Sequence, residues 1–210
     1  MTASIEMWFD FASPYAFVAL DAAEQVAARY GRTVRWRPIL LWAALKAHGV
    51  PPPMDPPARR AYFLVDMARS AAYFGRTYRA PRHFPISTHR AARLYYTLAE
   101  RDPALARAVG GSLIDAYFQD DQDISGAEAI ATVAARLGVP ETESTAAKDS
   151  EVGRRALAQA NEAAVAAGVC GSPWFVVDGE AFFGADRLPQ IEWGLGGGEF
   201  ERGGAHGRLL

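Results

Sequence analysis

The chain has 210 residues, of which half are apolar and 22% are charged, and its formal net charge is −2. This is the composition of a globular protein with one domain, or with one domain that carries a large insertion. The charge gives no reason to expect nucleic acid or an anionic membrane surface as a partner. The sequence has no run of about 18 apolar residues and no basic and apolar leader, so neither a membrane span nor a signal peptide is predicted.

The first 40 residues predict a strand, a helix and a second strand in close succession. Residues 5–11 are rich in β-branched and aromatic side chains, and residues 33–39 alternate in the same way. Between them, residues 14–30 carry alanine and apolar residues at helical spacing, and Gly31 ends this helix. Such a unit favours parallel pairing of its strands through a right-handed crossover.

The middle of the chain predicts helices alone. Residues 41–48 favour a short helix, and the five prolines within residues 49–57 predict a loop. Further helices are expected at about 58–75, 87–101, 103–119, 125–137 and 149–167. No strand pattern interrupts this region.

Strands return near the C-terminus, at residues 174–178 and 180–183, with a tight turn at Asp178-Gly179 between them. A last short helix begins near Asp186, and we expect the glycine-rich tail from Gly194 to be mobile. Together with the motifs below, this order predicts an α/β protein with a thioredoxin-like fold and a large all-helical insertion. The thioredoxin-like domain comprises residues 1–40 and 168–210, and the insertion comprises residues 41–167.

Residues 9–16, Phe-Asp-Phe-Ala-Ser-Pro-Tyr-Ala, close the first strand and open the first helix. Ser13 stands at the N-cap position and Pro14 at the first helical position. The N–H groups of a helix N-terminus stabilise an anion such as a thiolate. A thioredoxin-like active site has Cys-Pro-x-Cys at this junction, and here Ser13 and Ala16 replace both cysteines. The turn therefore predicts an external thiol, most simply glutathione; the alternative is an ordinary capping serine.

Two further segments point to the same ligand. Residues 171–174, Gly-Ser-Pro-Trp, precede a strand where thioredoxin-like folds place a cis-proline beside the active-site turn. We expect the Ser172–Pro173 bond to be cis, with the Ser172 backbone available to a peptide-like ligand. Asp186 either caps the last helix or holds the ammonium of a γ-glutamyl group through a charge-assisted hydrogen bond.

The single cysteine, Cys170, excludes an intrachain disulfide and a cysteine-rich metal site. It suits a reducing compartment such as the cytoplasm, and we expect its side chain to be buried and unreactive. The four histidines share no metal-binding spacing, so no metal site is predicted. They are His48, His83, His89 and His206.

The motifs together resemble the 2-hydroxychromene-2-carboxylate isomerases, a family in the DsbA-like branch of the thioredoxin superfamily that is close to the kappa-class glutathione transferases. The resemblance covers about residues 5–193. Besides the segments above, it rests on Arg37-Pro38-Ile39-Leu40-Leu41, Arg60-Ala61-Tyr62, His83-Phe84-Pro85 and Phe183-Gly184-Ala185-Asp186-Arg187-Leu188. It implies a thioredoxin domain with a helical insertion, a glutathione-dependent isomerase of aromatic degradation, and a homodimer.

The resemblance also implies roles for individual residues. Ser13 would be the catalytic residue that contacts the glutathione sulfur. The other glutathione-binding positions would be Ser172, Pro173, Phe183, Gly184, Ala185 and Asp186. The aromatic substrate would lie against Lys46, Pro85 and Ser87. The family often has Trp and Asn at positions 183 and 185, and Asn at position 87, so Ser87 bears on which aromatic acid is accepted.

Other functions stay open. A kappa-type transferase would conjugate glutathione to electrophiles, and a binding module would hold glutathione or a peptide without turnover. The lack of Cys-x-x-Cys argues against a disulfide oxidoreductase. His83 and His89 flank the expected substrate loop, either as acid–base groups or as solvated or packed histidines. The nearby arginines form a solvated face or a carboxylate clamp; they are Arg76, Arg79, Arg82, Arg90 and Arg93.

Overall fold

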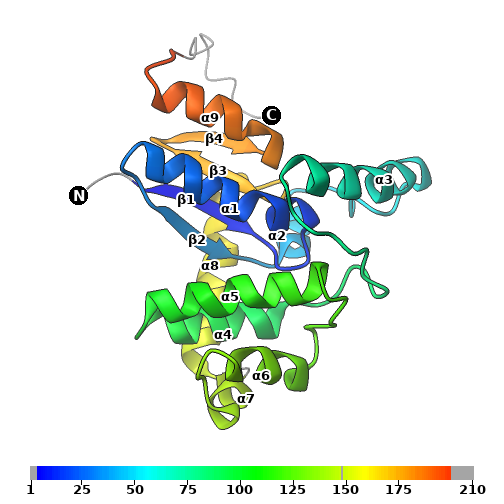
Figure 1. Cartoon of the computed structure of the whole chain (residues 1–210), viewed down its shortest axis with the longest axis vertical. Coiled ribbons are helices and arrows are strands. Elements are labelled where there is room, and N and C mark those ends of the chain that lie inside the picture. The colour runs from blue at the N-terminus through cyan, green and yellow to red at the C-terminus, as the bar shows by residue number, and fades with distance from the viewer. Residues whose placement is uncertain (1–3, 148, 200–210) are drawn as a thin grey trace.

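A four-stranded sheet joins the two ends of the chain in the computed structural model, which describes residues 4–147 and 149–199 (Figure 1). Its strands are β1 (Ile5–Phe9), β2 (Val34–Pro38), β3 (Trp174–Val177) and β4 (Glu180–Phe183), in the order β2-β1-β3-β4. β1 pairs in parallel with β2 and antiparallel with β3. α1 (Pro14–Arg29) connects β1 to β2, so the predicted parallel strand–helix–strand unit is confirmed.

Helices cover both faces of this sheet. α1 and α9 (Leu188–Leu195) lie against one face, and α8 (Glu151–Ala166) lies behind the other (Figure 1). The side chains of β1 alternate accordingly, because successive strand residues point to opposite faces. Met7 and Phe9 join the main core on the α1 side, whereas Trp8 packs with Ala160 and Ala164 of α8. The predicted thioredoxin-like α/β fold is confirmed.

The described residues between β2 and β3 form helices and no strand, which confirms the all-helical insertion. The helices before α8 are α2 (Leu41–Ala47), α3 (Pro57–Tyr73), α4 (His89–Ala99), α5 (Pro103–Phe118), α6 (Ala127–Ala135) and α7 (Glu141–Ala147). The sequence analysis does not predict α7. This helix has seven residues, mostly polar, and buries only Ser144 and Ala147, so it lacks the apolar periodicity that marks a helix.

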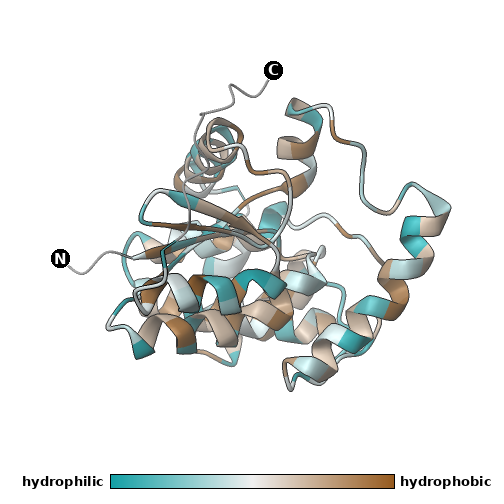
Figure 2. Cartoon of the chain, turned by 90° about the horizontal axis from the view of Figure 1, so that it is seen from above, coloured by the Kyte–Doolittle hydropathy of each residue, from teal (hydrophilic) through white to brown (hydrophobic). Residues whose placement is uncertain are grey.

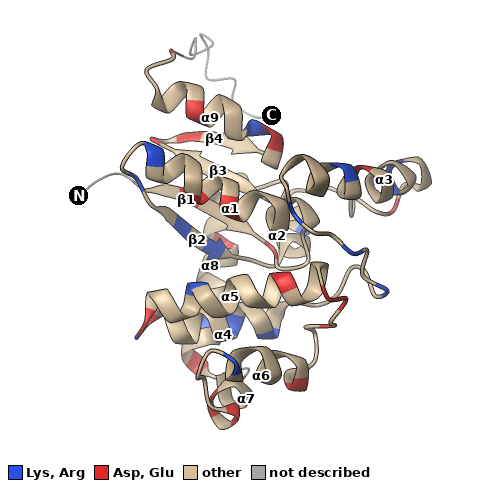
Figure 3. Cartoon of the chain, in the orientation of Figure 1, with Lys and Arg blue, Asp and Glu red and all other residues tan. Residues whose placement is uncertain are grey.

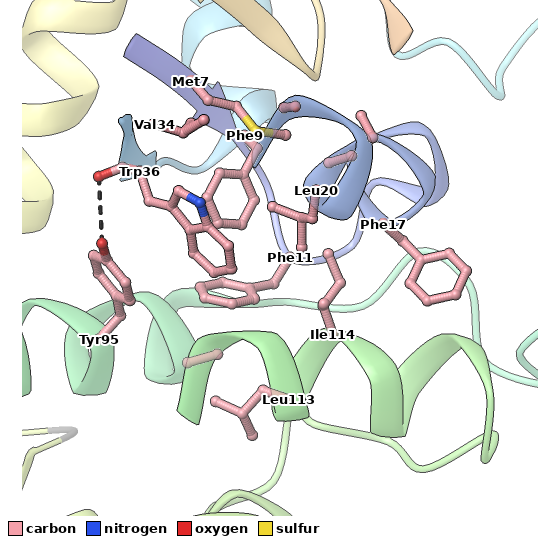
Figure 4. Packing of buried hydrophobic residues seen from close by; sticks show 14 of the residues in the cluster. Met7, Phe9, Phe11, Phe17, Leu20, Val34, Trp36, Tyr95, Leu113 and Ile114 are labelled. Carbon is pink, nitrogen blue, oxygen red and sulfur yellow. Dashed lines mark hydrogen bonds between the residues drawn. The ribbon is translucent and has the colours of Figure 1, made fainter. Parts of the chain in front are cut away.

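One core joins the insertion to the sheet (Figure 4). The Trp36 ring of β2 lies edge-on to Phe9, with ring centres 5.4 Å apart, and stacks on Tyr95 of α4. Gly110 lets α5 approach these rings: a Cβ at this position would lie 3.2 Å from Tyr95 and 3.3 Å from Trp36. The insertion and the thioredoxin-like part are therefore packed as a unit, not as two separately buried cores.

Away from this core, α3 stands apart from the body of the molecule (Figures 1 and 2). It buries Met67 and Ala71 and exposes several large apolar side chains: Tyr62, Leu64, Val65 and Tyr73. Charges of both signs are scattered over the elements, consistent with the small net charge (Figure 3). None of the described helices is long and apolar enough to cross a membrane.

The C-terminal end differs in part from the prediction. Gly194 and Leu195 still belong to α9, so the helix continues past the point where the mobile tail was expected. Residues 200–210, with His206 and the rest of the predicted tail, lie outside the described residues, as do residues 1–3. Among the residues that are described, no group of three His, Cys, Asp or Glu side chains could hold a metal ion.

Arg76, which follows α3, ties α1 to the insertion. Its guanidinium donates hydrogen bonds to Asp21 of α1 and Asp115 of α5 and lies 4.4 Å from the centre of the Phe17 ring. Only 14% of the Arg76 side chain is exposed. Because two acceptors and an aromatic face surround a poorly solvated cation, we expect this contact to contribute more than an ordinary surface ion pair.

We predict that Arg76→Ala lowers the free energy of unfolding by about 1–3 kcal/mol, since two carboxylates and a ring lose their partner at once. Urea denaturation measures the change. The control is Arg154→Ala, which removes an exposed pair with Glu151 on α8 and should leave the unfolding midpoint nearly unchanged. Equal midpoints for the two variants would contradict the role assigned to Arg76.

Candidate active site

The turn between β1 and α1 presents Ser13 at the N-terminus of a helix. Its hydroxyl oxygen accepts a hydrogen bond from the Ala16 N–H at 3.2 Å, and Pro14 occupies the first helical position. The Ser13 N–H donates to the Asp10 carbonyl at 2.9 Å, which closes the turn. The predicted N-cap is confirmed. Ser13 is 7% exposed, so its hydroxyl lies in a largely desolvated position.

The loop that contains Pro173 lies directly against this turn. The Ser13 hydroxyl donates to the Ser172 carbonyl at 2.9 Å, across 159 positions of sequence. The Ser172 hydroxyl accepts from the Asp10 N–H at 3.1 Å. The Ser172–Pro173 bond is cis, as predicted; the Phe84–Pro85 bond is also cis, which the sequence analysis does not predict. The Ser172 carbonyl therefore already has a donor within the protein, and that donor is the Ser13 hydroxyl.

The segment after β4 extends the same surface. The Gly184 N–H donates to the Pro173 carbonyl at 3.0 Å. The Phe183 ring packs over Gly171, where an added Cβ would come within 1.9 Å of the ring, and it stacks beside Trp174 with ring centres 6.3 Å apart. Phe183 is nonetheless 51% exposed, so one face of its ring is open to a ligand.

Asp186 ends this surface as an exposed carboxylate. Its side chain is 72% exposed, and one oxygen lies 3.3 Å from Arg187. The 3₁₀ turn at Ala185–Arg187 is preceded by Gly184, and no side chain caps it. The capping alternative for Asp186 is therefore wrong, because the residue lies inside the turn. One carboxylate oxygen lies over Gly184, where an added Cβ would come within 2.4 Å of it, while the side chain as a whole stays open to solvent and Ala185 is buried.

Asp10 is the residue whose importance the sequence analysis misses. Its carboxylate is buried, and it accepts hydrogen bonds from three segments: the Ala12 N–H at 2.9 Å, the Leu41 N–H at 2.8 Å and the Thr88 hydroxyl at 2.7 Å. Burial raises the pKa of the Asp10 carboxyl, and the three donors oppose that shift. The available signal was an aspartate directly after a strand, which is typical of an Asx turn.

The predicted substrate-side residues are placed less firmly. Lys46 is exposed near the end of α2, and Pro85 and Ser87 are exposed in the loop before α4. Among the described residues, no hydrogen bond joins these three side chains to Ser13. Ser87 instead bonds the His89 Nδ1 at 2.9 Å. Their role toward a substrate therefore stays a prediction.

Most of the neighbouring charged groups hold the fold. Besides Arg76, Arg82 pairs with Asp121, and Arg90 donates to the Ser125 carbonyl. The Arg82 side chain is 78% exposed, which favours the solvated face for this residue, whereas Arg76 and Arg90 are bonded to other parts of the fold. Burial, followed by the charges of Arg90 and Arg93, lowers the pKa of His89, so its neutral form is favoured.

The prediction of a buried Cys170 is wrong, because this side chain is exposed. The residue lies in the segment between α8 and β3, between two buried neighbours. Val169 packs into the cluster around Trp8, and Gly171 is covered by Phe183. Cys170, between them, points outward.

This combination of a thioredoxin-type turn, a cis-proline loop beside it and a helical insertion defines a thioredoxin-fold protein of the DsbA-like class. The chain belongs to the DSBA-like thioredoxin domain family, whose model matches residues 4–195. It is 26% identical over 200 residues to glutathione S-transferase kappa 1 of Caenorhabditis elegans, covering 89% of this chain and 88% of that relative.

A second relative and a solved structure are both named as the same isomerase. The chain is 27% identical over 198 residues to 2-hydroxychromene-2-carboxylate isomerase of Sphingobium xenophagum, covering 91% of this chain and 97% of that relative. A solved structure of a 2-hydroxychromene-2-carboxylate isomerase superposes with a TM-score of 0.83 at 24% identity, covering 92% of this chain and 95% of that one. The relatives are thus isomerases and kappa transferases, which supports an enzyme.

We predict that Asp10→Asn lowers the free energy of unfolding by about 1–3 kcal/mol. An amide has one acceptor oxygen, so its NH₂ group would meet one of the donors that now bind the carboxylate, and a buried donor would lose its acceptor. Chemical denaturation measures the loss. Asp102→Asn is the control, because Asp102 caps α5 through one bond to the Leu105 N–H and asparagine caps equally well. An equally small loss in both variants would contradict the prediction.

Proposed function

We propose that this protein is a glutathione-dependent isomerase that acts on 2-hydroxychromene-2-carboxylate or a related intermediate of aromatic degradation. The observation that carries the proposal is the Ser13 hydroxyl, held at the N-terminus of α1 and bonded to Ser172 of the cis-proline loop. A turn of thioredoxin type that has serine and alanine in place of both cysteines calls for a thiol from outside. Relatives named as isomerases and as glutathione transferases support this choice.

The residues present fit glutathione. The turn offers a hydroxyl and helix N-terminal dipole to a sulfur anion. The Ser172 backbone and the exposed part of Phe183 would contact a small peptide, with the Ser172 carbonyl released for it when the Ser13 hydroxyl turns toward sulfur. Asp186 offers an exposed carboxylate to an α-ammonium group. From Ser13 to Asp186, these groups would contact in turn the sulfur, the peptide backbone and the ammonium group of glutathione.

Ser13 stabilises negative charge in this scheme. Glutathione, when bound, would supply a thiolate for reversible addition to an unsaturated ring-opened substrate; its later departure would return the thiolate unchanged, so atoms and electrons balance. The Ser13 hydroxyl has one proton, which is now donated to the Ser172 carbonyl. Turning that proton toward sulfur lowers the pKa of the bound thiol, and the N–H groups of α1 add to the effect.

Lys46 and the loop with Pro85 and Ser87 would face the aromatic acid in this proposal. Ser87, where relatives of this family often have asparagine, would then tune which acid is accepted. The proposal includes a homodimer in a reducing, cytoplasmic setting, where glutathione is abundant.

A kappa-type transferase is the second candidate, because the chain is almost as similar to the kappa transferase as to the isomerase. Both functions require glutathione binding, which calorimetry with millimolar glutathione tests. A result without binding would overturn both functions, and also the alternative of a module that binds glutathione. Absorbance assays with 2-hydroxychromene-2-carboxylate and with an aryl halide electrophile then separate isomerase from transferase. Glutathione binding without either activity would favour the binding module.

We predict that Ser13→Ala raises the pKa of the bound thiol and lowers turnover by about 30- to 1000-fold, because a hydrogen bond to an anion is lost. Affinity for glutathione should change little, since the peptide and ammonium contacts lie elsewhere. Ultraviolet titration of the thiolate and steady-state rates measure both effects.

The matched control is Ser150→Ala. Ser150 caps α8 in the same way, through a bond from the Gly153 N–H to its hydroxyl at 3.2 Å. Both variants should lose about 1 kcal/mol of stability. Only Ser13→Ala should change the pKa of the bound thiol and the turnover rate. Identical kinetics in the two variants would mean that Ser13 does no more than cap α1.

We predict that Asp186→Ala weakens glutathione binding by about 1.5–3 kcal/mol, the contribution of a hydrogen bond between charged groups. Calorimetry at low ionic strength measures the change. Asp55→Ala serves as the control, because it removes the same charge from an exposed loop residue. If both variants bind glutathione as the unmodified protein does, Asp186 has no part in the site.

A further inference from the structure

Asp10 contacts both halves of the candidate site at once. Through its backbone it contacts the side where glutathione is proposed to bind: its N–H donates to the Ser172 hydroxyl and its carbonyl accepts from Ser13. Through its carboxylate it contacts the insertion, at Leu41 and Thr88. Leu41 begins the helix that carries Lys46, and Thr88 directly follows the loop that carries Pro85 and Ser87.

The two bonds to the insertion lie at element starts. Leu41 opens α2, which carries Lys46, and Thr88 stands at the N-cap position of α4, directly after the loop with Pro85 and Ser87. Thr88 is 1% exposed, and its hydroxyl donates to Asp10 instead of capping α4. A buried threonine whose hydroxyl leaves its own helix uncapped is better explained by the link to Asp10 than by helix formation.

We infer that Asp10 and Thr88 are positioning residues that fix the loop of residues 84–88 relative to Ser13, so that the aromatic substrate meets the thiol at a set distance. The inference rests on the proposed function. Neither residue contacts the reacting atoms, since both side chains are buried and bonded to one another. Displacing a substrate by about 1 Å can cost two orders of magnitude in rate, so a short buried hydrogen bond at this place is enough to matter.

The test compares three variants. Thr88→Val keeps the shape of the side chain and removes the donor, Thr88→Ser restores the donor, and Thr97→Val removes a hydroxyl of the same helix that bonds only within α4, to the Arg93 carbonyl. Each is assayed for glutathione affinity, bound-thiol pKa, KM and kcat with the aromatic substrate, and amide hydrogen exchange of residues 84–92.

For Thr88→Val we expect kcat/KM to fall about tenfold, with faster amide exchange at residues 84–92 and unchanged glutathione affinity and thiol pKa. Thr88→Ser should recover most of the activity, and Thr97→Val should behave as the unmodified protein. Kinetics of Thr88→Val equal to those of Thr97→Val would overturn the inference, as would a loss confined to glutathione affinity.

Failure of the proposed function gives a different pattern. If the unmodified protein neither isomerises nor conjugates any substrate tried, the exchange data still decide. Faster exchange at residues 84–92 in Thr88→Val, but not in Thr88→Ser, would support the positioning role. Unchanged exchange would overturn it.

Discussion

The hydrogen bond from the Ser13 hydroxyl to the Ser172 carbonyl joins the two ends of the chain at the candidate site. It joins the first turn of the chain to a loop 159 positions away, in a place where both residues are buried. The bond from the Asp10 N–H to the Ser172 hydroxyl and the pairing of β1 with β3 hold the same loop against the turn, so the loop keeps its place if the Ser13 proton turns away. The bond to the Ser172 carbonyl occupies the one proton that Ser13 can donate, so a ligand that accepted this proton would have to break the internal contact.

The sheet and the insertion share the residues that hold this place together. Trp36 belongs to β2 and packs on Tyr95 of α4, and Arg76 bridges α1 and α5. Closer to the site, Tyr15 of α1 donates to Asp66 of α3 at 2.8 Å, and its ring meets Phe63 edge-on. The insertion is therefore bonded to the turn between β1 and α1 through Asp10, and to the first turn of α1 through Tyr15.

Much of this could be predicted from the sequence, because local rules decide it. The cap at Ser13, the parallel strand pair, the hairpin at Asp178-Gly179 and the position of Pro173 follow from residue types at fixed spacing. What could not be predicted depends on distant contacts. The Asp10 carboxylate accepts hydrogen bonds from donors 31 and 78 positions away. α7 is held by packing and has no periodic apolar pattern. Cys170 is exposed because its neighbours on both sides, Val169 and Gly171, are the residues that are buried.

The absence of a side chain at Gly110 determines how closely α5 packs against the sheet. Glycine inside a helix costs about 1 kcal/mol relative to alanine, and here it lets α5 lie against the rings of Trp36 and Tyr95 with no room for even a methyl group at ordinary distance. A larger residue at this position would push the Trp36 and Tyr95 rings, or α5 itself, aside by at least a few tenths of an ångström. Since Trp36 belongs to the sheet and Tyr95 to the insertion, a sequence change at this one position would alter how the insertion packs on the sheet.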